Sequence, residues 1–183
     1  MNKKEQRDYI RGIMQGLEEV YCLDSDRKIF EKITHMEAYR RASCIFCYVS
    51  VGTEPDTLAL LQDAWSQNKR TVVPRCIGKG IMELCEIKSL DDLESGHYNI
   101  PEPKKECPVI QASEIDFGII PCLSCDRQRN RLGHGGGYYD RYLAGTDFLS
   151  VALCREKLLL DEVCMEEYDL PVDVVVTEDH IYS

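Results

Sequence analysis

Apolar residues recur three or four positions apart at the start of the chain, with charged residues between them: Ile10, Ile13, Met14, Leu17 and Val20. This spacing predicts an amphipathic helix over residues 3–21. The same spacing recurs in a second set: Ile29, Phe30, Ile33 and Met36. It predicts a second helix, which Asp24 or Ser25 could cap at its N-terminus. We therefore expect two amphipathic helices before the first strand.

Short apolar runs rich in β-branched residues follow these helices, at 44–49, 71–74, 81–87, 116–121, 148–154 and 172–177. Helical patterns lie at 57–67 and from Tyr138 onward. Strands that alternate with helices predict an α/β fold with a mixed, largely parallel sheet. In such sheets ligands bind beyond the carboxyl ends of the strands, so the candidate loops are 50–57, 121–137 and those at either end of 172–178. We expect the proline-containing stretch 94–108 to be irregular.

The composition adds limits on size, partners and location. The chain has 183 residues, of which 44% are hydrophobic, and shows no change in composition that would mark a linker, so we expect a single domain over 1–183. The net charge of −10 argues against partners such as nucleic acid or an anionic membrane, which select basic proteins. No apolar run is long enough to span a bilayer. We expect a cytoplasmic monomer.

Ten cysteines raise the question of disulfides or a metal site. The N-terminus is charged and shows no signal-peptide pattern, so we expect reduced thiols. Two Cys-x-x-Cys pairs occur. Cys44 and Cys47 lie in a predicted buried strand, where residues three apart point to opposite faces and cannot bind one ion. Cys122 and Cys125 follow a strand, and a metal or redox role stays open for them, although no thioredoxin-like order of elements surrounds them.

A glycine-dense turn lies between residues 131 and 141, and contains Gly133, Gly135, Gly136 and Gly137. Backbone without side chains can take positive φ and turn successive N–H groups toward an anion. The helix predicted from Tyr138 would add its N-terminus. Four arginines lie in the same region of this acidic chain: Arg127, Arg129, Arg131 and Arg141. The pattern matches neither a Walker loop nor a dinucleotide fingerprint. It indicates an anion site, and the alternative is a flexible turn before a helix.

Ordered motifs along the chain resemble the 5-formyltetrahydrofolate cyclo-ligase family, also called methenyltetrahydrofolate synthetase. The main one is Pro121 and Asp126 followed by Arg131-Leu-Gly-x-Gly-Gly-Gly-Tyr-Tyr-Asp-Arg141. The others are Lys3-x-x-x-Arg7, Tyr48-Val-Ser-x-x-x-Glu54 with Asp56-Thr57, Pro74, Ile100-Pro-Glu-Pro103 and Pro171-Val-Asp-Val-Val-Val-Thr-Glu178. They span nearly the whole chain. The resemblance implies a three-layer α/β/α fold of the NagB/RpiA/CoA transferase-like type.

The resemblance also implies an activity: the ATP- and Mg²⁺-dependent conversion of 5-formyltetrahydrofolate to 5,10-methenyltetrahydrofolate, with release of ADP and phosphate. In the family the γ-phosphoryl group passes to the formyl oxygen, the other folate nitrogen attacks the activated carbon, and phosphate leaves. Such chemistry depends on positioning and on neutralising charge.

Residue roles follow from the resemblance position by position. ATP contacts are expected from Lys3, Lys4, Arg7, Arg131, Leu132, Gly133, His134, Gly135, Gly136, Gly137, Tyr138 and Tyr139. Catalytic roles are expected for Arg131, Asp140 and Tyr138. Folate contacts are expected from Val49, Glu54, Gly135, Gly136, Gly137 and Tyr138. Asp140 and Asp173 are the expected magnesium ligands, because Mg²⁺ bound to nucleotide usually takes one or two carboxylates besides phosphate oxygens.

Several assignments have simpler alternatives. Lys3 and Arg7 could form an ordinary solvated helix face, and Tyr138 or Tyr139 could pack the helix onto the sheet instead of contacting substrate. We interpret His134 as a lining residue and not as a base.

The chain departs from the family pattern at two positions. Cys125 stands where an apolar aromatic residue is more usual, and Cys122 replaces a small residue. Two rival functions remain: a phosphosugar isomerase of related fold, which would need a second acid–base group beside the turn, and a non-catalytic nucleotide- or folate-binding paralogue.

Overall fold

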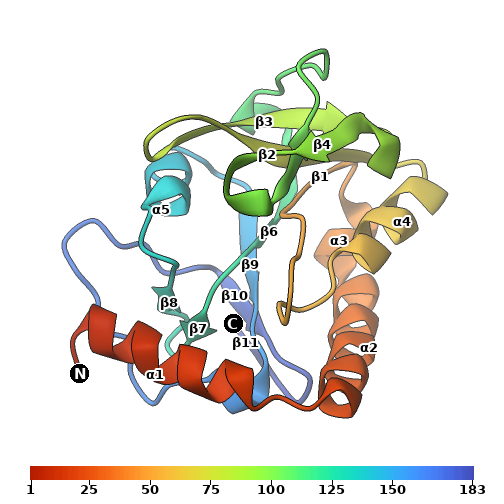
Figure 1. Ribbon diagram of the computed structural model, residues 1–183. Coiled ribbons are helices and arrows are strands. Elements are labelled where there is room, and N and C mark those ends of the chain that lie inside the picture. The colour runs from red at the N-terminus through yellow and green to blue at the C-terminus, as the bar shows by residue number, and fades with distance from the viewer.

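The computed structural model describes residues 1–183 and contains a seven-stranded mixed sheet with the order β11-β10-β9-β6-β1-β2-β3 (Figure 1). Its strands are β1 (Cys44–Cys47), β2 (Arg70–Gly78), β3 (Ile81–Ile87), β6 (Phe117–Ile120), β9 (Leu149–Leu153), β10 (Val174–Val176) and β11 (Ile181–Tyr182). The central pairs are parallel, whereas β3 and β11 run antiparallel to their neighbours at the two edges. The predicted α/β fold with a largely parallel sheet is confirmed.

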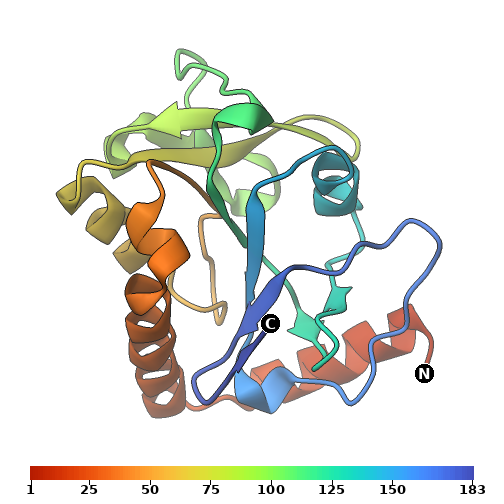
Figure 2. The same cartoon turned by 180° about the vertical axis from the view of Figure 1, so that it is seen from behind.

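Five α-helices cover the two faces of the sheet: α1 (Lys3–Gln15), α2 (Glu19–His35), α3 (Glu37–Arg41), α4 (Leu58–Ser66) and α5 (Tyr138–Leu143). Helices α1 and α5 lie on one side, and α2, α3 and α4 lie on the other, as both views show (Figure 1 and Figure 2). Four short 3₁₀ helices are η1 (Leu90–Asp92), η2 (His97–Asn99), η3 (Ala112–Glu114) and η4 (Glu156–Leu158). The arrangement is the expected three-layer architecture.

Strand β1 shows how the sequence separates the two cores. Cys44 and Phe46 point into the core beneath α1 and α5, whereas Ile45 and Cys47 point into the core beneath α2 and α4. This alternation follows from the two-residue period of a strand. The prediction that Cys44 and Cys47 face opposite sides of the sheet is therefore confirmed.

The predicted helix over 3–21 is in fact two helices. Helix α1 starts at a capping box made by Asn2 and Glu5 and ends at Gly16, and α2 begins at Glu19. Val20 was expected on the apolar face but is 78% exposed. Helical spacing alone did not mark the break, because Leu17 and Val20 continue the period across a glycine at which a helix readily stops.

Ser25 does not cap a helix, contrary to the prediction, and neither does Asp24. Both lie inside α2, where the Ser25 hydroxyl is buried and donates a hydrogen bond to Glu178. Asp24 forms ion pairs with Arg27 and Lys28 on the exposed face.

Two further boundaries differ from the prediction. Strand β2 continues to Gly78 and forms a hairpin with β3, and the stretch expected to be irregular contains a small antiparallel pair, β4 (Leu93–Ser95) and β5 (Pro101–Pro103). A second small sheet joins β7 (Ser124–Cys125) and β8 (Arg131–Leu132). None of the helices combines the length and the apolar character that crossing a bilayer requires.

Candidate functional site

The glycine segment, defined here as residues 133–137, connects β8 to α5. Gly135 has φ +105° and Gly137 has φ +67°, so both adopt backbone conformations that side-chain-bearing residues rarely take. Two arginines fix the segment from opposite ends. Arg7 Nε donates to the Gly133 carbonyl at 2.8 Å, and Arg141 Nη1 donates to the carbonyls of Gly136 and, in the β2–β3 turn, Gly80. Helix α5 has only six residues, so the expected contribution of its N-terminus is small.

Helix α1 brings its basic residues to this segment because a buried glutamine anchors it. Gln6 donates to the Glu162 carbonyl at 2.8 Å and accepts from the Cys164 amide at 3.0 Å. Lys3 lies one turn before Arg7, and its ammonium is paired with Asp169 and, at 3.5 Å, with Glu166. Lys4 is exposed and forms no hydrogen bond or ion pair.

Arg131 is buried beneath the segment and does not project toward solvent. Its Nη2 donates to Asp140 Oδ1 at 2.9 Å, and its Nη1 donates to the Pro121 carbonyl at 3.1 Å. Its Nε is the one buried side-chain nitrogen or oxygen without a hydrogen-bond partner. The guanidinium therefore holds Asp140 in place, and the direct phosphate contact expected of it would require a rearrangement.

The two tyrosines that follow the glycines differ in their surroundings. The Tyr139 ring stacks on Phe46 of β1 with centroids 6.1 Å apart, and the Arg131 guanidinium lies over it at 5.7 Å. Burial raises the pKa of Tyr139. Tyr138 is half-buried against the same core. Tyr139 thus packs α5 onto the sheet, which is the simpler of the two alternatives.

The loop after β1 meets the glycine segment through a side-chain pair. Glu54 Oε1 lies 3.8 Å from His134 Nε2, and Glu54 Oε2 accepts from the Val51 amide at 2.8 Å. Burial raises the pKa of Glu54 to about 7, although the Val51 hydrogen bond acts in the opposite direction. Burial lowers the pKa of His134, and nearby arginines lower it further. Val49 is buried two residues after the end of β1, just before this loop.

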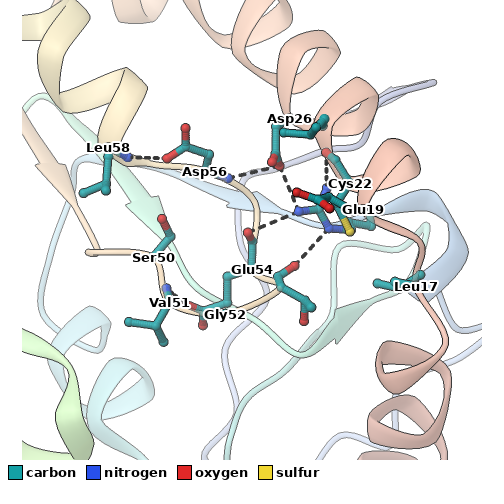
Figure 3. Close-up of a pocket in the computed structure, with 13 residues that line it drawn as sticks. Leu17, Glu19, Cys22, Asp26, Ser50, Val51, Gly52, Glu54, Asp56 and Leu58 are labelled. Carbon is teal, nitrogen blue, oxygen red and sulfur yellow. Dashed lines mark hydrogen bonds and ion pairs between the residues drawn. The ribbon is translucent and has the colours of Figure 1, made fainter.

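A pocket of about 450 Å³ lies between the 50–57 loop and the junction of α1 and α2 (Figure 3). Glu54 lines it, together with Asp26 of α2 and Asp56. Its volume is within the range of small-molecule sites, about 300–1,000 Å³. Glu54 thus lines the pocket and also lies 3.8 Å from His134, which is not among the lining residues.

Arg155 connects the elements around this pocket. Its guanidinium is only 1% exposed, donates to the carbonyls of Thr53, Glu54 and Cys22, and pairs with Asp26 at 2.9 Å. Asp26 also accepts from the Asp56 amide at 3.1 Å. One buried arginine therefore fixes the 50–57 loop to α2. Arg155 belongs to none of the motifs recognised in the sequence, although a charged residue two positions after the apolar run of β9 is a usable signal.

Asp140 contacts Leu170 in the stretch of chain that leads to Asp173 and β10. The carboxylates of Asp140 and Asp173 nevertheless have separate hydrogen-bond partners. Asp140 Oδ1 accepts from Arg131 and, at 3.5 Å, from the Leu170 amide. Asp173 Oδ2 accepts from the backbone and hydroxyl of Ser150 at 2.8 Å each. Asp173 precedes β10, so it lies at the amino end of that strand. Each carboxylate has one oxygen free of hydrogen bonds, and the two belong to no group of three or more potential ligands.

Two other acidic residues in the family-like motifs are structural. Asp126 is fully buried and accepts hydrogen bonds from the amides of Gln128, Asn130 and Val163. Glu178 is buried and accepts from Ser25 and from the Glu156 amide, and Tyr21 also donates to it. Burial opposes its ionisation, but these hydrogen bonds prevail and lower its pKa. Both carboxylates hold loops in place.

The cysteines are all free thiols. Cys122, Cys125 and Cys154 are buried together on the sheet face that α1 and α5 cover. Hydrogen bonds from the Cys125 and Cys154 thiols lower the pKa of Cys122, whereas the pKa values of Cys125 and Cys154 are raised by their contacts with Cys122. The second Cys-x-x-Cys pair thus differs from Cys44 and Cys47, which point apart.

Comparison with known proteins gives a consistent answer. A family model described as the 5-formyltetrahydrofolate cyclo-ligase family matches residues 2–178. The 5-formyltetrahydrofolate cyclo-ligase of Haemophilus influenzae is 29% identical, and the match covers 95% of this chain and 97% of the relative. That of Mycolicibacterium smegmatis is 31% identical over 73% of this chain and 72% of its own length.

Solved structures with the same fold carry a related name. The NMR structure of Aquifex aeolicus 5,10-methenyltetrahydrofolate synthetase has a TM-score of 0.88 and 25% identity, over 99% of this chain and 92% of that chain. The Mycoplasma pneumoniae 5,10-methenyltetrahydrofolate synthetase, at 19% identity, has a TM-score of 0.80 over 97% of this chain and 99% of its own, and shows the fold alone.

Proposed function

The chain belongs to the 5-formyltetrahydrofolate cyclo-ligase family, and on that premise we propose that it converts 5-formyltetrahydrofolate to 5,10-methenyltetrahydrofolate with ATP and Mg²⁺. The γ-phosphoryl group of ATP passes to the formyl oxygen, and ADP leaves. The other folate nitrogen then attacks the activated formyl carbon, the C–O bond breaks, and phosphate departs as the ring closes. The enzyme acts mainly by positioning the two substrates and neutralising charge.

The observation that carries this proposal is the approach of Glu54 to His134 at 3.8 Å. It brings the loop after β1, which borders the pocket, to the glycine segment, which Arg7 holds from the other side. A phosphoryl transfer between two bound substrates needs two adjoining sites of different character. One side here is a cavity with a carboxylate, and the other is an exposed turn flanked by cations.

The phosphates of ATP would lie along the exposed backbone of the glycine segment. Gly135 and Gly136 present main chain to solvent without side chains, and Arg7 and Lys3 supply positive charge at its edge. In this proposal ATP phosphates displace Asp169 from Lys3, since an ammonium carries three donors and can exchange partners. Lys4, Tyr138 and the backbone of Leu132 and Tyr139 complete the proposed ATP contacts.

Arg131 would act in this site by positioning Asp140, with which it is paired at 2.9 Å. Asp140 and Asp173 are the proposed magnesium ligands. The donor set fits, because each has a carboxylate oxygen free of hydrogen bonds and Mg²⁺ needs only one or two carboxylates beside phosphate oxygens and water. When bound, the ion would neutralise charge on the transferred phosphoryl group.

Glu54 would accept hydrogen bonds from the amine and ring N–H groups of the pterin, with Val49, Tyr138 and the glycine segment at its borders. A pKa of about 7 means that the carboxylate is only partly ionised in the empty site at neutral pH. Donors from the folate would favour the ionised form. Folate binding and ionisation of Glu54 are therefore coupled.

The proposal is tested by mixing the protein with 5-formyltetrahydrofolate, ATP and Mg²⁺ and following the absorbance of the methenyl product. We expect product only when all three are present, with one phosphate released per product formed. A folded protein at micromolar concentration that gives no product would overturn the proposal. Asp161→Asn, a change at an exposed aspartate away from the site, should retain activity.

A further inference from the structure

Three cysteines from two separate parts of the chain converge at the carboxyl edge of the sheet. The sulfur atoms of Cys122, Cys125 and Cys154 all lie within 4.8 Å of one another, and all three residues are buried. The strand register explains the meeting. Strands β6 and β9 are parallel neighbours with Ile120 opposite Ala152, so residues two positions further along each strand, Cys122 and Cys154, emerge side by side. The chain then turns into β7, which brings Cys125 next to Cys122 and Cys154.

This arrangement is more specific than the frequent burial of single cysteines. The other seven cysteines belong to no group of potential ligands, and no histidine or carboxylate joins these three. Free cysteines usually behave as small hydrophobic residues, and such a role requires no convergence of their sulfur atoms. Because the three sulfur atoms already lie within 4.8 Å of one another, little rearrangement is needed for them to bind one ion.

We propose that Cys122, Cys125 and Cys154 form a three-thiolate site for a soft metal ion, and that Cu(I) is the ion it suits best. Thiolates favour Cu(I), zinc and iron–sulfur clusters over hard cations. Structural zinc is almost always four-coordinate, and a fourth protein ligand is lacking here. Cu(I) accepts three sulfur ligands. Binding forms three Cu–S bonds and releases the three thiol protons to solvent, with no change of oxidation state.

The surroundings of the cysteines provide the positive charge that such a site needs. Three thiolates and one monovalent ion carry two net negative charges. Cys122 follows Pro121, whose carbonyl accepts from the buried guanidinium of Arg131 at 3.1 Å. Metal binding would therefore place negative charge near Arg131, beneath the glycine segment.

The test uses full-length protein in which the three half-buried thiols are removed by Cys22→Ser, Cys76→Ser and Cys164→Ser, so that competing binding is reduced. This protein is titrated with Cu(I) under anaerobic conditions against a chromophoric Cu(I) chelator. We expect one Cu(I) per chain to remain bound to the protein in the presence of the chelator. X-ray absorption should show three sulfur neighbours, and an ultraviolet thiolate-to-copper band should appear at the same stoichiometry.

Cys154→Ser in this background should lose the tightly bound Cu(I), and Cys154→Ala serves as a second variant if the first fails to fold, as judged by circular dichroism. Cys107→Ser is the matched control, because Cys107 is buried but lies outside the group, beside the Asp92 carbonyl. It should bind Cu(I) as the parent does. Equal binding after both Cys154 changes, or coordination by fewer than three sulfurs, would overturn the proposal.

Two further outcomes would also overturn it. If Zn²⁺ remains bound to the same protein in competition with a zinc chelator, and Cu(I) is removed by the Cu(I) chelator, the choice of ion is wrong. If peptide mapping of the purified protein shows a Cys122–Cys125 disulfide, and the reduced protein binds no Cu(I), the group is a redox pair and not a metal site. None of these measurements uses turnover, so the result is independent of the proposed enzymatic function.

Discussion

Arg131 and Asp140 form a hydrogen-bonded ion pair at 2.9 Å in which the arginine side chain is only 3% exposed. The arginine comes from β8 and the aspartate from α5, so the pair spans the glycine segment and fixes its two ends. A charge that is buried this completely has to remain paired, because water cannot solvate it. The pair therefore couples the fold of the segment to the proposed metal site.

Asp140→Asn should reduce both turnover and stability. The amide keeps the shape of the side chain but leaves the Arg131 charge without its counterion, and breaking a buried pair costs about 3–5 kcal/mol. We expect the free energy of unfolding in urea to fall by roughly 3 kcal/mol, because Asp140 is partly accessible to water. We also expect kcat to fall by about a hundredfold.

Asp173→Asn separates the two effects of the Asp140 change. Asp173 is exposed and its partners are neutral groups of Ser150, so its loss should cost little stability. If both aspartates bind the ion, both variants should need more Mg²⁺ for half-maximal activity, measured by titration at saturating ATP. An unchanged Mg²⁺ requirement in Asp140→Asn would remove that residue from the metal site.

Arg7→Ala should weaken ATP binding more than it weakens folate binding. Its Nε holds the Gly133 carbonyl at 2.8 Å, and its guanidinium lies against Gly135. Hydrogen bonds to charged groups contribute about 1.5–3 kcal/mol, so we expect KM for ATP to rise on the order of tenfold or more. Arg41→Ala is the control, because Arg41 is an exposed arginine of α3 that is paired only with Glu37 at the surface. Equal effects of the two changes on KM would contradict the role of Arg7.

Glu54 should make the stability of the empty protein fall as pH rises. The unfolded carboxyl has a pKa near its ordinary value of 4.5, whereas the folded one has a pKa of about 7. Between these values the folded state binds more protons than the unfolded state. The contribution of Glu54 to the free energy of unfolding is therefore fully present below pH 4.5 and is lost as pH rises to 7. The size of the effect is about 3 kcal/mol. Urea unfolding of the parent and of Glu54→Gln across this range measures it.

Glu54→Gln should remove this pH dependence, whereas Glu94→Gln, a change at an exposed residue, should leave it intact. In turnover assays the parent should show a KM for 5-formyltetrahydrofolate that decreases as pH rises through 7, because the ionised carboxylate is the better acceptor. The variant should show a higher KM that does not vary with pH. A parent KM that is flat across pH 7 would argue against contact between Glu54 and the folate.

The sequence predicted the central sheet well because its signals are local. The apolar runs of β1, β6 and β9 are short, bounded and rich in β-branched residues, and the alternation in β1 correctly placed Cys44 and Cys47 on opposite faces. The break between α1 and α2 was missed, because the apolar period continues past Gly16. A period reports which face is buried and does not report where the backbone turns.

The site was harder to predict because it depends on contacts between distant residues. The glycine segment was found from its composition, but the burial of Arg131 follows from the packing of α5 on β1. The convergence of Cys122 with Cys154 follows from the register of β6 against β9, which no local pattern contains. Arg155 reaches chain more than a hundred residues earlier, at Thr53 and Glu54.

Arg155→Met should loosen the 50–57 loop and impair folate binding selectively. The change keeps much of the side-chain length but removes the donors to Thr53 and Glu54 and leaves Asp26 unpaired. Hydrogen exchange of the Asp56 amide, which is bonded to Asp26, should accelerate, because the loop loses its main tie to α2.

The kinetic consequence distinguishes this local effect from general destabilisation. Because Glu54 lies on the affected loop, KM for 5-formyltetrahydrofolate should rise by on the order of tenfold, the equivalent of about 1.4 kcal/mol. KM for ATP should change little, because Arg7 and the glycine segment have no contact with Arg155. Arg27→Met removes an exposed arginine of α2 that pairs with Asp24 and Glu31, and it should change neither KM nor exchange at Asp56. A parallel rise in both KM values after Arg155→Met would mean that the arginine supports the fold as a whole and not the folate loop.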